Sequence, residues 1–384
     1  MHRLLTLTNP DVLPRRIVYI ISDIEKALAF EWISDTIDKQ KIDLHFIVLG
    51  RIDTPLIAFL KDRGMPHYPV PFAGKADLLR VWITVFSILK KLKPHAVHTH
   101  LYFANLIGLS AAWVLRIPKR IHTRHHGALH HRYFPRSVYI DKVVNALSSH
   151  IIVPCLNQQT IVTGWEGAKK EKVFLIEHGI DLPYFQKEEP DKVSLLRHSH
   201  KLPDGRFPIV CVIARYTEWK GIQFIIPAFK TLLAAHPMAH LVLCNARGDY
   251  AGHIKALLRT LPDGCYTEIP FEPELASLYR LFDVFVHAPI DEYAEAFGQV
   301  YIEALASGIP SIFTLSGIAC DFVRHHEDAW VVPHKNADEI ATAMGALLND
   351  PSLRARLIQS GRRRVSERFD IREMIGKLEA LYTA

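Results

Sequence analysis

Short apolar runs and longer amphipathic segments alternate along the chain. The runs at residues 16–22, 44–49 and 96–100 are rich in β-branched and aromatic residues, as is typical of buried strands. The segments between them, such as residues 76–92, repeat their apolar residues at helical spacing. Strands that alternate with helices predict right-handed βαβ units and a parallel sheet, which binds ligands at the carboxyl ends of its strands.

The alternation is interrupted by a polar stretch at residues 183–206 and then resumes. A chain of 384 residues is long enough for two domains. We therefore predict an α/β protein with a Rossmann-like domain at residues 1–182, a linker at 183–206 and a second Rossmann-like domain at 207–368. A terminal helix is predicted to follow at residues 369–384.

The amino-acid composition and charge exclude few classes of function. Five cysteines are scattered, mostly in apolar runs, which predicts reduced, buried thiols in a cytoplasmic protein. The first 14 residues lack the apolar core of a signal peptide, and the longest apolar run, 78–92, is interrupted by charges, so no membrane span is expected. The net charge of +6 suits an anionic ligand or an anionic membrane face and does not indicate nucleic acid.

A candidate anion site lies between a predicted strand at residues 283–288 and a predicted helix at 297–306. The amides of Phe297, Gly298 and Gln299 would form the free N-terminus of that helix. Unpaired N–H groups and the helix dipole attract an anion there.

Two carboxylates flank this helix start. Glu295 precedes it, and Glu303 lies more than a turn further in. Taken alone, Glu295 reads as a helix-start carboxylate and Glu303 as a solvated helix residue. The apolar neighbours of Glu303 instead indicate a largely buried helix, where a charge needs a partner. A polyol attached to a phosphate would satisfy the amides and both carboxylates.

Two cations, Arg215 and Lys220, flank a loop between a predicted strand at residues 208–214 and a predicted helix at 221–235. An arginine fork and a lysine point charge are common partners of a diphosphate. Such a pair is more often surface charge, but its place after a strand and before a glycine-initiated helix favours phosphate binding.

Histidines gather where two predicted strands end, at residues 98–100 and 123–131. Their spacing matches no zinc pattern. We interpret most of them as strand-end or loop residues with ordinary hydrogen bonds, and we expect no metal. Residues 126–137, rich in histidine and arginine, are predicted to form a mobile loop.

Several motifs together resemble the GT-B family of retaining glycosyltransferases known as family 4, or glycosyltransferase group 1. Seven residues separate Glu295 from Glu303, with Phe-Gly following the first glutamate after one residue and Ala-Leu-Ala-Ser-Gly-Ile-Pro following the second, as in that family. Segment 214–221 resembles the family's arginine–lysine loop. Segment 278–286 resembles the family's strand before the first glutamate, and segment 316–318 resembles its glycine loop. The resemblance is strong over about residues 207–370 and weaker before them.

The resemblance implies a metal-independent enzyme with two Rossmann-like domains facing a cleft. The N-terminal domain would bind the acceptor, the C-terminal domain would bind a UDP- or GDP-sugar, and the last helix would cross back to the N-terminal domain. His125 matches the family histidine by spacing, with His126 as the alternate. The catalytic residues would be His125, Glu295, Arg215 and Lys220, and the donor would be bound by Arg215, Lys220, Glu295, Phe297, Gly298, Gln299 and Glu303.

The function so predicted is retaining transfer of a sugar to a hydroxyl of a glycan or lipid-linked acceptor in cell-envelope polysaccharide synthesis. No cofactor or metal is expected, and the protein would be cytoplasmic with a peripheral membrane contact. Two alternatives stay open: a nucleotide-sugar binding protein without turnover, and a nucleotide-sugar epimerase. The chain departs from the family at residues 22–26, where a Gly-Gly turn is usual, and at His178, which replaces an asparagine.

Overall fold

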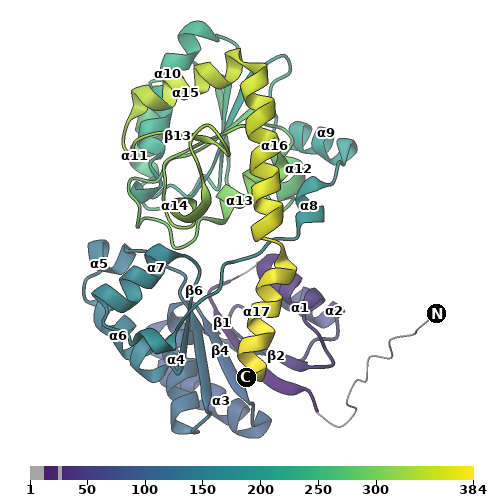
Figure 1. Cartoon of the computed structure of the whole chain (residues 1–384), viewed down its shortest axis with the longest axis vertical. Helices are drawn as coiled ribbons and strands as arrows, with labels where there is room; N and C mark the ends of the chain where they lie inside the picture. Colours follow the sequence, from purple (N-terminus) through teal and green to yellow (C-terminus); the bar gives the residue numbers. More distant parts are fainter. Residues whose placement is uncertain (1–12, 25–27) are drawn as a thin grey trace, which may run out of the picture.

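The structure, a computed structural model, describes residues 13–24 and 28–384. It contains two α/β domains stacked along the long axis of the molecule, the N-terminal one below the C-terminal one in Figure 1. Each domain is built on one sheet, and all strand pairs in both sheets are parallel. The predicted fold class is thereby confirmed.

The N-terminal sheet has the strand order β3-β2-β1-β4-β5-β6-β7. Its strands are β1 (Arg15–Ser22), β2 (Ile42–Gly50), β3 (His67–Pro71), β4 (Ala96–His100), β5 (Lys119–Thr123), β6 (His150–Val153) and β7 (Val173–Leu175). The side chains of the central strand alternate between two layers of helices, because successive residues of a strand face opposite sides. Val18 and Ile20 pack in the cluster that includes α3 (Leu78–Leu92) and α4 (Tyr102–Val114). Ile17, Tyr19 and Ile21 pack in the cluster that includes α1 (Leu28–Thr36) and α17 (Ile371–Thr383).

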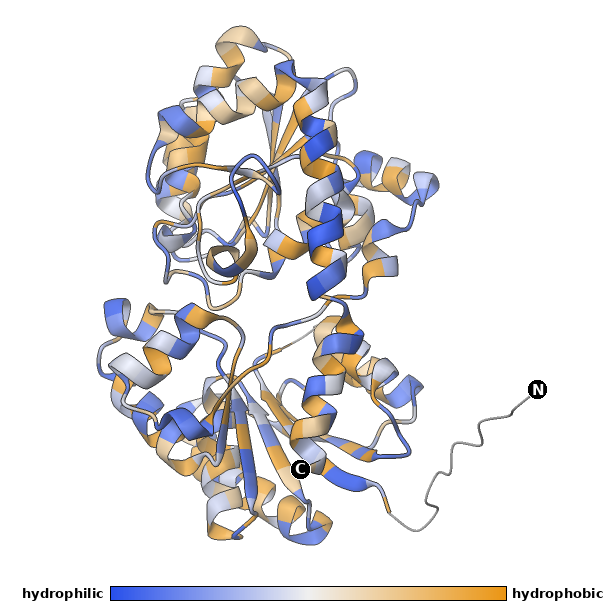
Figure 2. Ribbon diagram, viewed as in Figure 1, coloured by the Kyte–Doolittle hydropathy of each residue, from blue (hydrophilic) through white to orange (hydrophobic). Residues whose placement is uncertain are grey.

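The C-terminal sheet has the order β10-β9-β8-β11-β12-β13. Its strands are β8 (Ile209–Ile213), β9 (His240–Cys244), β10 (Tyr266–Ile269), β11 (Val284–His287), β12 (Ser311–Phe313) and β13 (Trp330–Val331). Apolar residues fill both faces of the sheets, as Figure 2 shows by the orange strands and the bluer outer sides of the helices.

Helices connect the strands in both domains. In the N-terminal domain they are α1 (Leu28–Thr36), α2 (Pro55–Asp62), α3 (Leu78–Leu92), α4 (Tyr102–Val114), α5 (Leu129–Tyr133), α6 (Ser137–Leu147) and α7 (Leu156–Thr160). The remaining helices are α8 (Leu182–Gln186), α9 (Pro190–Ser199), α10 (Ile222–Ala235), α11 (Ala251–Leu258), α12 (Leu275–Tyr279), α13 (Gln299–Ser307), α14 (Ala319–Phe322), α15 (Ala337–Asn349), α16 (Pro351–Arg368) and α17 (Ile371–Thr383). None of the helices in the described ranges is long and apolar enough to cross a membrane.

The chain crosses between the domains twice. It leaves the N-terminal sheet through α8 and α9, and it returns through α17, which runs from the end of α16 into the lower domain of Figure 1. Helix α17 packs against α1 and β1. The Tyr382 hydroxyl, near the end of α17, is 2.5 Å from the Tyr19 hydroxyl and 2.7 Å from His98 Nδ1.

Helices lie within two segments that the sequence predicts as a linker and as a loop. The polar stretch 183–206 contains the helices α8 and α9, each of which begins with a proline at N1 or N2. The predicted loop 126–137 contains α5. In both segments, charged residues hide short helices from a periodicity analysis.

Helix α3, predicted from the helical spacing of residues 76–92, buries only part of its wide apolar surface. The sheet side of α3 carries Val81, Val85 and Leu89, while Leu79 and Ile83 are 72 % and 53 % exposed. A helix that is apolar on most of its circumference buries only the side that meets the sheet. Residues 25 and 26, part of the segment 22–26 where the sequence departs from the family, lie outside the described ranges.

Candidate active site

A pocket of about 300 Å³ lies between the two domains, at the carboxyl ends of both sheets. The loops after β5 and β7 line it from the N-terminal domain, and those after β8 and β11 line it from the C-terminal domain. Its lining includes His125, His126, His178, Arg215, Trp219, Lys220, Glu295, Phe297, Gly298 and Gln299. The tertiary structure therefore brings together all the predicted site residues except Glu303.

Glu295 is a buried carboxylate in contact with a cation and an imidazole. Its Oε1 atom is 2.5 Å from Lys220 Nζ and 2.9 Å from His287 Nε2. Burial by itself would raise the pKa of Glu295, but the Lys220 ammonium and the His287 hydrogen bond outweigh burial and hold the pKa far below its usual range. Glu295 is therefore ionised at neutral pH.

The loop that carries Lys220 depends on Gly221. This residue has a φ of +71°, and a Cβ atom placed on it would lie 1.8 Å from the Ala288 carbonyl oxygen. Only glycine fits this close approach of two loops. The contact fixes the Lys220 loop against the end of β11, close to Glu295.

The helix after Glu295 begins two residues later than predicted. Gly298 is its N-cap residue, with a φ of +83°, and α13 begins at Gln299. A residue in this left-handed conformation cannot belong to the right-handed helix. The N–H groups of Phe297, Gly298 and Gln299 donate to no acceptor within residues 13–24 and 28–384, so they are free to bind an anion as predicted.

Arg215 is exposed and follows β8. No ion pair or hydrogen bond joins its guanidinium to another described residue. Lys220, by contrast, already contacts Glu295. The two predicted cations thus differ. The Arg215 guanidinium is unpaired at the pocket, whereas the Lys220 ammonium is bound to the Glu295 carboxylate, which also lines the pocket.

Glu303 lies apart from this pocket, on the buried side of α13. Its carboxylate accepts a hydrogen bond from the Tyr279 hydroxyl at 3.0 Å, and the residue is 5 % exposed. Burial raises the pKa of Glu303 from 4.5 to about 7, although the Tyr279 hydrogen bond opposes the shift. The expected burial is confirmed, and the partner that a buried carboxylate needs is a tyrosine.

His125 belongs to a group of packed imidazoles. Its Nε2 atom is 3.0 Å from His100 Nδ1, and its ring stacks on His178 with 5.7 Å between centroids. Burial lowers the pKa of His125 well below its usual range and that of His178 to about 4. Both imidazoles are therefore neutral at pH 7 and can donate or accept a hydrogen bond.

A second cavity of about 210 Å³ adjoins the first and shares His125, His178 and Gln299 with it. Apolar side chains of β1, α1 and α17 line most of this cavity, together with His98 and His100. The Nε2 atom of His100 is buried and has no hydrogen-bond partner in the described structure.

The structure separates the two candidate histidines. The imidazole of His126 does not join the His125 group. Its Nε2 atom is 3.3 Å from Asp141 Oδ2, and Asp141 is also 2.7 Å from His130 Nδ1. Of the two candidates, His125 is thus the one that lines both cavities.

Three residues around the site were not predicted from the sequence to have a role there. His287 ends β11 and binds Glu295, Tyr279 binds Glu303, and His178 stacks on His125. His287 and Tyr279 lie within apolar segments that predict core packing. Nothing in those segments indicates that the polar atoms of these two side chains bind the glutamates. His178 was recognised only as a departure from a turn motif.

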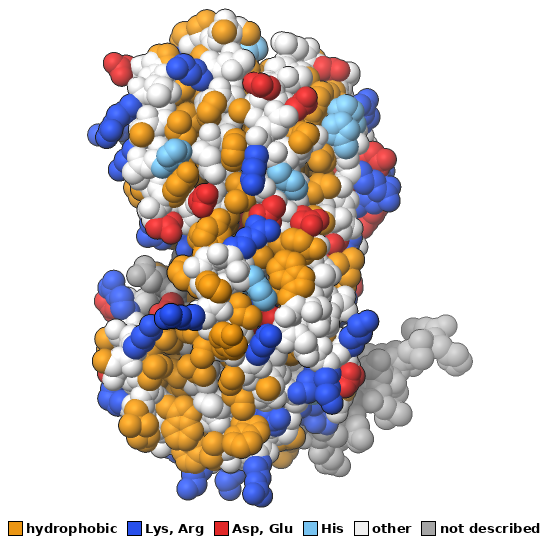
Figure 3. Space-filling view, turned by 90° about the vertical axis from the view of Figure 1, so that its left-hand side faces the viewer, with side chains coloured by type: hydrophobic (Ala, Val, Ile, Leu, Met, Phe, Trp, Pro, Cys, Tyr) orange, Lys and Arg blue, Asp and Glu red, His pale blue; other side chains and the backbone are white. Residues whose placement is uncertain are grey.

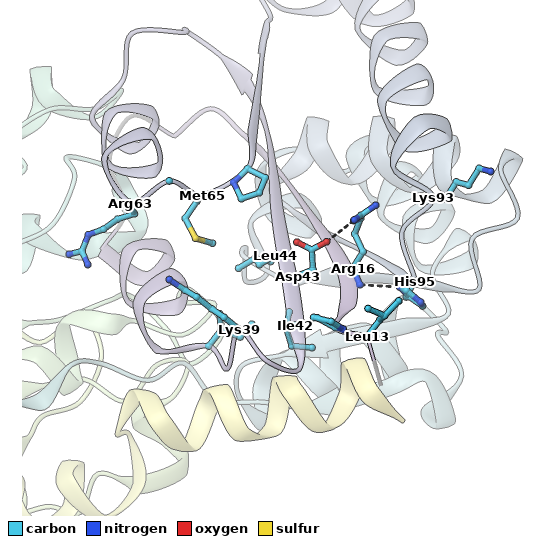
Figure 4. A pocket seen from close by; sticks show the side chains of 14 residues that line it. Leu13, Arg16, Lys39, Ile42, Asp43, Leu44, Arg63, Met65, Lys93 and His95 are labelled. Atoms are coloured by element: carbon cyan, nitrogen blue, oxygen red, sulfur yellow. Dashed lines mark hydrogen bonds and ion pairs between the residues drawn. The ribbon is translucent and has the colours of Figure 1, made fainter. Parts of the chain in front are cut away.

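A further pocket, of about 520 Å³, lies elsewhere. Figure 4 shows it at the amino ends of β1 and β2, where the Arg16 side chain donates to Asp43 at 2.7 Å and the Arg16 backbone N–H donates to His95 Nδ1 at 2.9 Å. None of the predicted site residues lines it. Because ligands of parallel α/β sheets bind at the carboxyl ends of strands, the pocket between the domains is the better candidate.

Two parallel-sheet Rossmann-like domains with such a pocket between them define the GT-B class of fold. The chain belongs to the glycosyl transferases group 1 family, whose model matches residues 196–364. The model described as Glycosyltransferase Family 4 matches residues 33–183. The protein is therefore a glycosyltransferase, as its sequence predicts.

Similar proteins agree with this assignment. The chain is 26 % identical over 374 residues to the capsular polysaccharide biosynthesis glycosyltransferase CapM of Staphylococcus aureus, covering 89 % of this chain and 97 % of CapM. It is 32 % identical over 168 residues to a GDP-mannose-dependent alpha-mannosyltransferase of Mycobacterium tuberculosis, covering 42 % of this chain and 40 % of that protein. HepE of Anabaena, solved in complex with UDP and glucose, shares the fold with a TM-score of 0.81 at 17 % identity, over 96 % of this chain and 99 % of HepE.

Proposed function

We propose that the protein is a retaining glycosyltransferase that moves a sugar from a UDP- or GDP-sugar to a hydroxyl of a glycan or lipid-linked acceptor, in cell-envelope polysaccharide synthesis. The main support is the convergence of Arg215, Lys220, Glu295 and the unpaired α13 amides on one pocket. The similarity to CapM supports the polysaccharide context. The named donors of the mycobacterial relative and of HepE support a GDP- or UDP-sugar.

In this proposal the diphosphate binds at the cationic side of the pocket. The Arg215 guanidinium is available for a bidentate contact, and the free N–H groups at the start of α13 add uncharged donors. Lys220 has three N–H donors, so it can contact a phosphate while one of them stays on Glu295. These groups neutralise the charge of the leaving diphosphate without a metal ion.

The carboxylates would hold the sugars of the donor. Ionised Glu295 accepts hydrogen bonds from hydroxyls of the transferred sugar, next to the phosphate. Glu303 accepts the ribose hydroxyls, which requires its carboxylate to turn from Tyr279 or to share that contact. The neutral His125 imidazole faces the transferred sugar from the other domain.

The reaction breaks the bond between the anomeric carbon and the diphosphate oxygen and forms a bond from that carbon to the acceptor oxygen. Retention requires the acceptor to attack on the face that the diphosphate leaves. The acceptor proton passes to the departing diphosphate, so charge and atoms balance. Closure of the two domains over the pocket would exclude water and limit hydrolysis of the donor.

The decisive experiment measures release of free nucleotide diphosphate from UDP-, GDP- and ADP-sugars. We expect slow release from one donor class by the wild type, and a decrease of about 10²–10³-fold for Lys220→Met or Glu295→Gln, as for loss of a charge-stabilising contact in the transition state. Lys230→Met, on the exposed side of α10, is the matched control. Unchanged release in the site variants would contradict the proposal.

The same assay separates the alternatives. Saturable binding without release in the presence of envelope glycan acceptors would indicate a binding protein, and a changed sugar on an intact nucleotide would indicate an epimerase. Once a product is isolated, the anomeric coupling constant in its NMR spectrum distinguishes retention from inversion.

A peripheral membrane contact is the second part of the proposal. Leu79 and Ile83 on α3 are exposed next to the basic end of that helix, Lys90, Lys91 and Lys93. Figure 3 shows hydrophobic side chains gathered on the lower domain, with lysine and arginine side chains along the lower edge of the molecule. An apolar strip beside a basic cluster suits the surface of an anionic bilayer.

Vesicle sedimentation tests this contact. We expect binding to vesicles that contain phosphatidylglycerol, weaker binding to phosphatidylcholine vesicles, and loss of binding in the double variant Leu79→Glu, Ile83→Glu. Leu195→Glu changes an equally exposed leucine on α9 and serves as the control. Equal binding of both variants would exclude α3 as the contact.

A further inference from the structure

A buried polar cluster lies behind the N-terminal wall of the pocket. His126, His130 and Asp141 each direct one side-chain atom to a common point, and these three atoms lie within 4.8 Å of one another. Asp141 Oδ2 is 3.3 Å from His126 Nε2 and 2.7 Å from His130 Nδ1. His126 precedes α5, His130 is in α5, and Asp141 comes from α6.

We propose that His126, His130 and Asp141 bind a divalent transition-metal ion, for which Zn²⁺ is the best match. Two imidazole nitrogens and one carboxylate oxygen are ligands that Zn²⁺ prefers, with water in the fourth position. Ligands at about 2.0–2.1 Å from a tetrahedral ion lie roughly 3.3 Å apart. The His126–Asp141 separation has this value, and the His130–Asp141 separation of 2.7 Å would have to lengthen slightly to admit the ion. The two histidine side chains are 19 % and 12 % exposed, so a water molecule can reach the ion.

The charge of the surrounding residues also favours a cation. Two carboxylates, Asp141 and Glu166, are buried around one guanidinium, that of Arg124, which is 2 % exposed. Arg124 Nη2 is 2.5 Å from Glu166 Oε1, and Arg124 Nη1 is 3.5 Å from Asp141 Oδ1. These two buried carboxylates therefore share a single guanidinium, and a buried carboxylate is costly without enough partners.

The second coordination layer is already built. Arg124 contacts both oxygens of Asp141, Oδ1 from Nη1 and Oδ2 from Nη2, each at 3.5 Å, and Glu166 holds Arg124 in place. His131 and Asn145 then bind Glu166, at 3.2 Å and 2.7 Å. Such outer contacts orient a metal-binding carboxylate and are typical of metal sites.

The proposed ion would be structural and would lie outside the donor pocket. It would fix the segment 126–130, whose Ala128 amide donates to the Tyr293 carbonyl of the other domain at 2.9 Å. Gly127 packs so closely on the same carbonyl that a Cβ atom would lie 2.3 Å from it. The ion would therefore hold the N-terminal wall of the pocket against the loop that carries Glu295. This proposal does not depend on sugar transfer, and the expectation of no metal stays a prediction that the experiment below tests.

The test is titration of chelator-treated, full-length protein with Co²⁺, followed by competition with Zn²⁺. We expect one saturable equivalent with the intense visible absorption of four-coordinate Co²⁺, displaced by Zn²⁺, and a Zn²⁺-dependent rise in melting temperature. His130→Gln and Asp141→Asn should weaken the apparent affinity at least about 100-fold, because each removes a ligand.

His131→Gln is the matched control, since His131 is the adjacent histidine but contacts Glu166 and not the proposed ion. It should bind Co²⁺ within a few-fold of the wild type. Absence of saturable binding by the wild type, or equal binding by all three variants, would overturn the proposal. Circular dichroism of each chelator-treated variant shows whether that variant has kept its fold. If a variant has unfolded, the titration of the wild type still shows whether the protein binds the ion.

Discussion

At the scale of single residues, the site depends on how two glutamates are neutralised. Glu295 stays ionised because Lys220 and His287 face it, whereas Glu303 is buried against a neutral tyrosine. The two carboxylates of one sequence motif therefore have opposite pKa shifts. This contrast supports different roles for them in the proposed site and leads to two predictions.

Lys220→Met is expected to lower the free energy of unfolding by about 3–5 kcal/mol, because it leaves the buried Glu295 carboxylate without its cation. Adding Glu295→Gln should restore part of this loss. Urea denaturation of both single variants and of the double variant measures the coupling. Lys230→Met should stay within about 0.5 kcal/mol of the wild type. Strictly additive effects of the two site substitutions would contradict the coupling.

Glu303 should make stability depend on pH. Its folded pKa of about 7 lies above its ordinary value of 4.5, so the unfolded chain releases this proton first as the pH rises. The stability that the protonated carboxyl contributes is complete below pH 4.5 and is lost as the pH rises through about 7.

We therefore expect Glu303→Gln, which cannot lose a proton, to gain roughly 2–4 kcal/mol relative to the wild type between pH 4.5 and pH 8. Urea denaturation at several pH values measures the difference. A pH-independent difference between the two proteins would mean that Glu303 titrates normally in the folded state.

At the scale of elements, the start of α13 combines conformation and chemistry. Gly298 places the chain in a left-handed turn, and this turn presents the unpaired amides beside Glu295. Helix α3 shows, by its exposed apolar side, that an amphipathic pattern does not fix which side of a helix is buried. Periodicity locates a helix but does not tell which part of a wide apolar surface the sheet will cover.

Gly298→Ala is expected to destabilise the protein by about 1–3 kcal/mol, since a Cβ atom would lie 2.6 Å from the Tyr301 ring at a φ of +83°. The substitution should also reorient the N–H groups at the start of α13. This change should weaken the binding of a nucleotide diphosphate at least about tenfold, or about 1.4 kcal/mol. Calorimetric titration with UDP and GDP measures the affinity.

Gly345→Ala is the control for this substitution. Gly345 lies in α15, and a Cβ atom there would contact nothing within 4 Å. This variant should gain about 0.5–1 kcal/mol and bind nucleotide normally. If Gly298→Ala behaved in the same way, the left-handed turn would not matter for binding.

At the scale of the whole molecule, α17 ties the end of the chain to the first domain. One apolar cluster runs from β1 through α17 and on to Phe285 of the C-terminal sheet. Arg368 forms a bidentate ion pair with Glu177 at the crossing. The pocket is thus formed by two domains that share a core, and the predicted domain limits at residues 182, 206 and 368 stay a prediction.

Tyr382→Phe should test this connection. It removes the hydroxyl that contacts Tyr19 and His98 and leaves their buried polar atoms unpaired. We expect a loss of about 1–3 kcal/mol in unfolding free energy, measured by urea denaturation. Tyr139→Phe, on a side chain that is 72 % exposed, should change it by less than about 0.5 kcal/mol. Equal effects of both substitutions would show that the α17 hydroxyl does not stabilise the molecule.

The sequence by itself determined the alternation of strands and helices, the two parallel sheets, and the loops at strand ends that carry Arg215, Lys220 and Glu295. These features follow from local periodicity and from glycine and proline at helix ends, which are properties of neighbouring residues. Only the tertiary structure decided that Lys220 pairs with Glu295, that His125 stacks on His178, and that Asp141 joins two histidines. Each of these contacts joins segments that are distant in the chain or lie on different elements, and only packing sets their distance and burial.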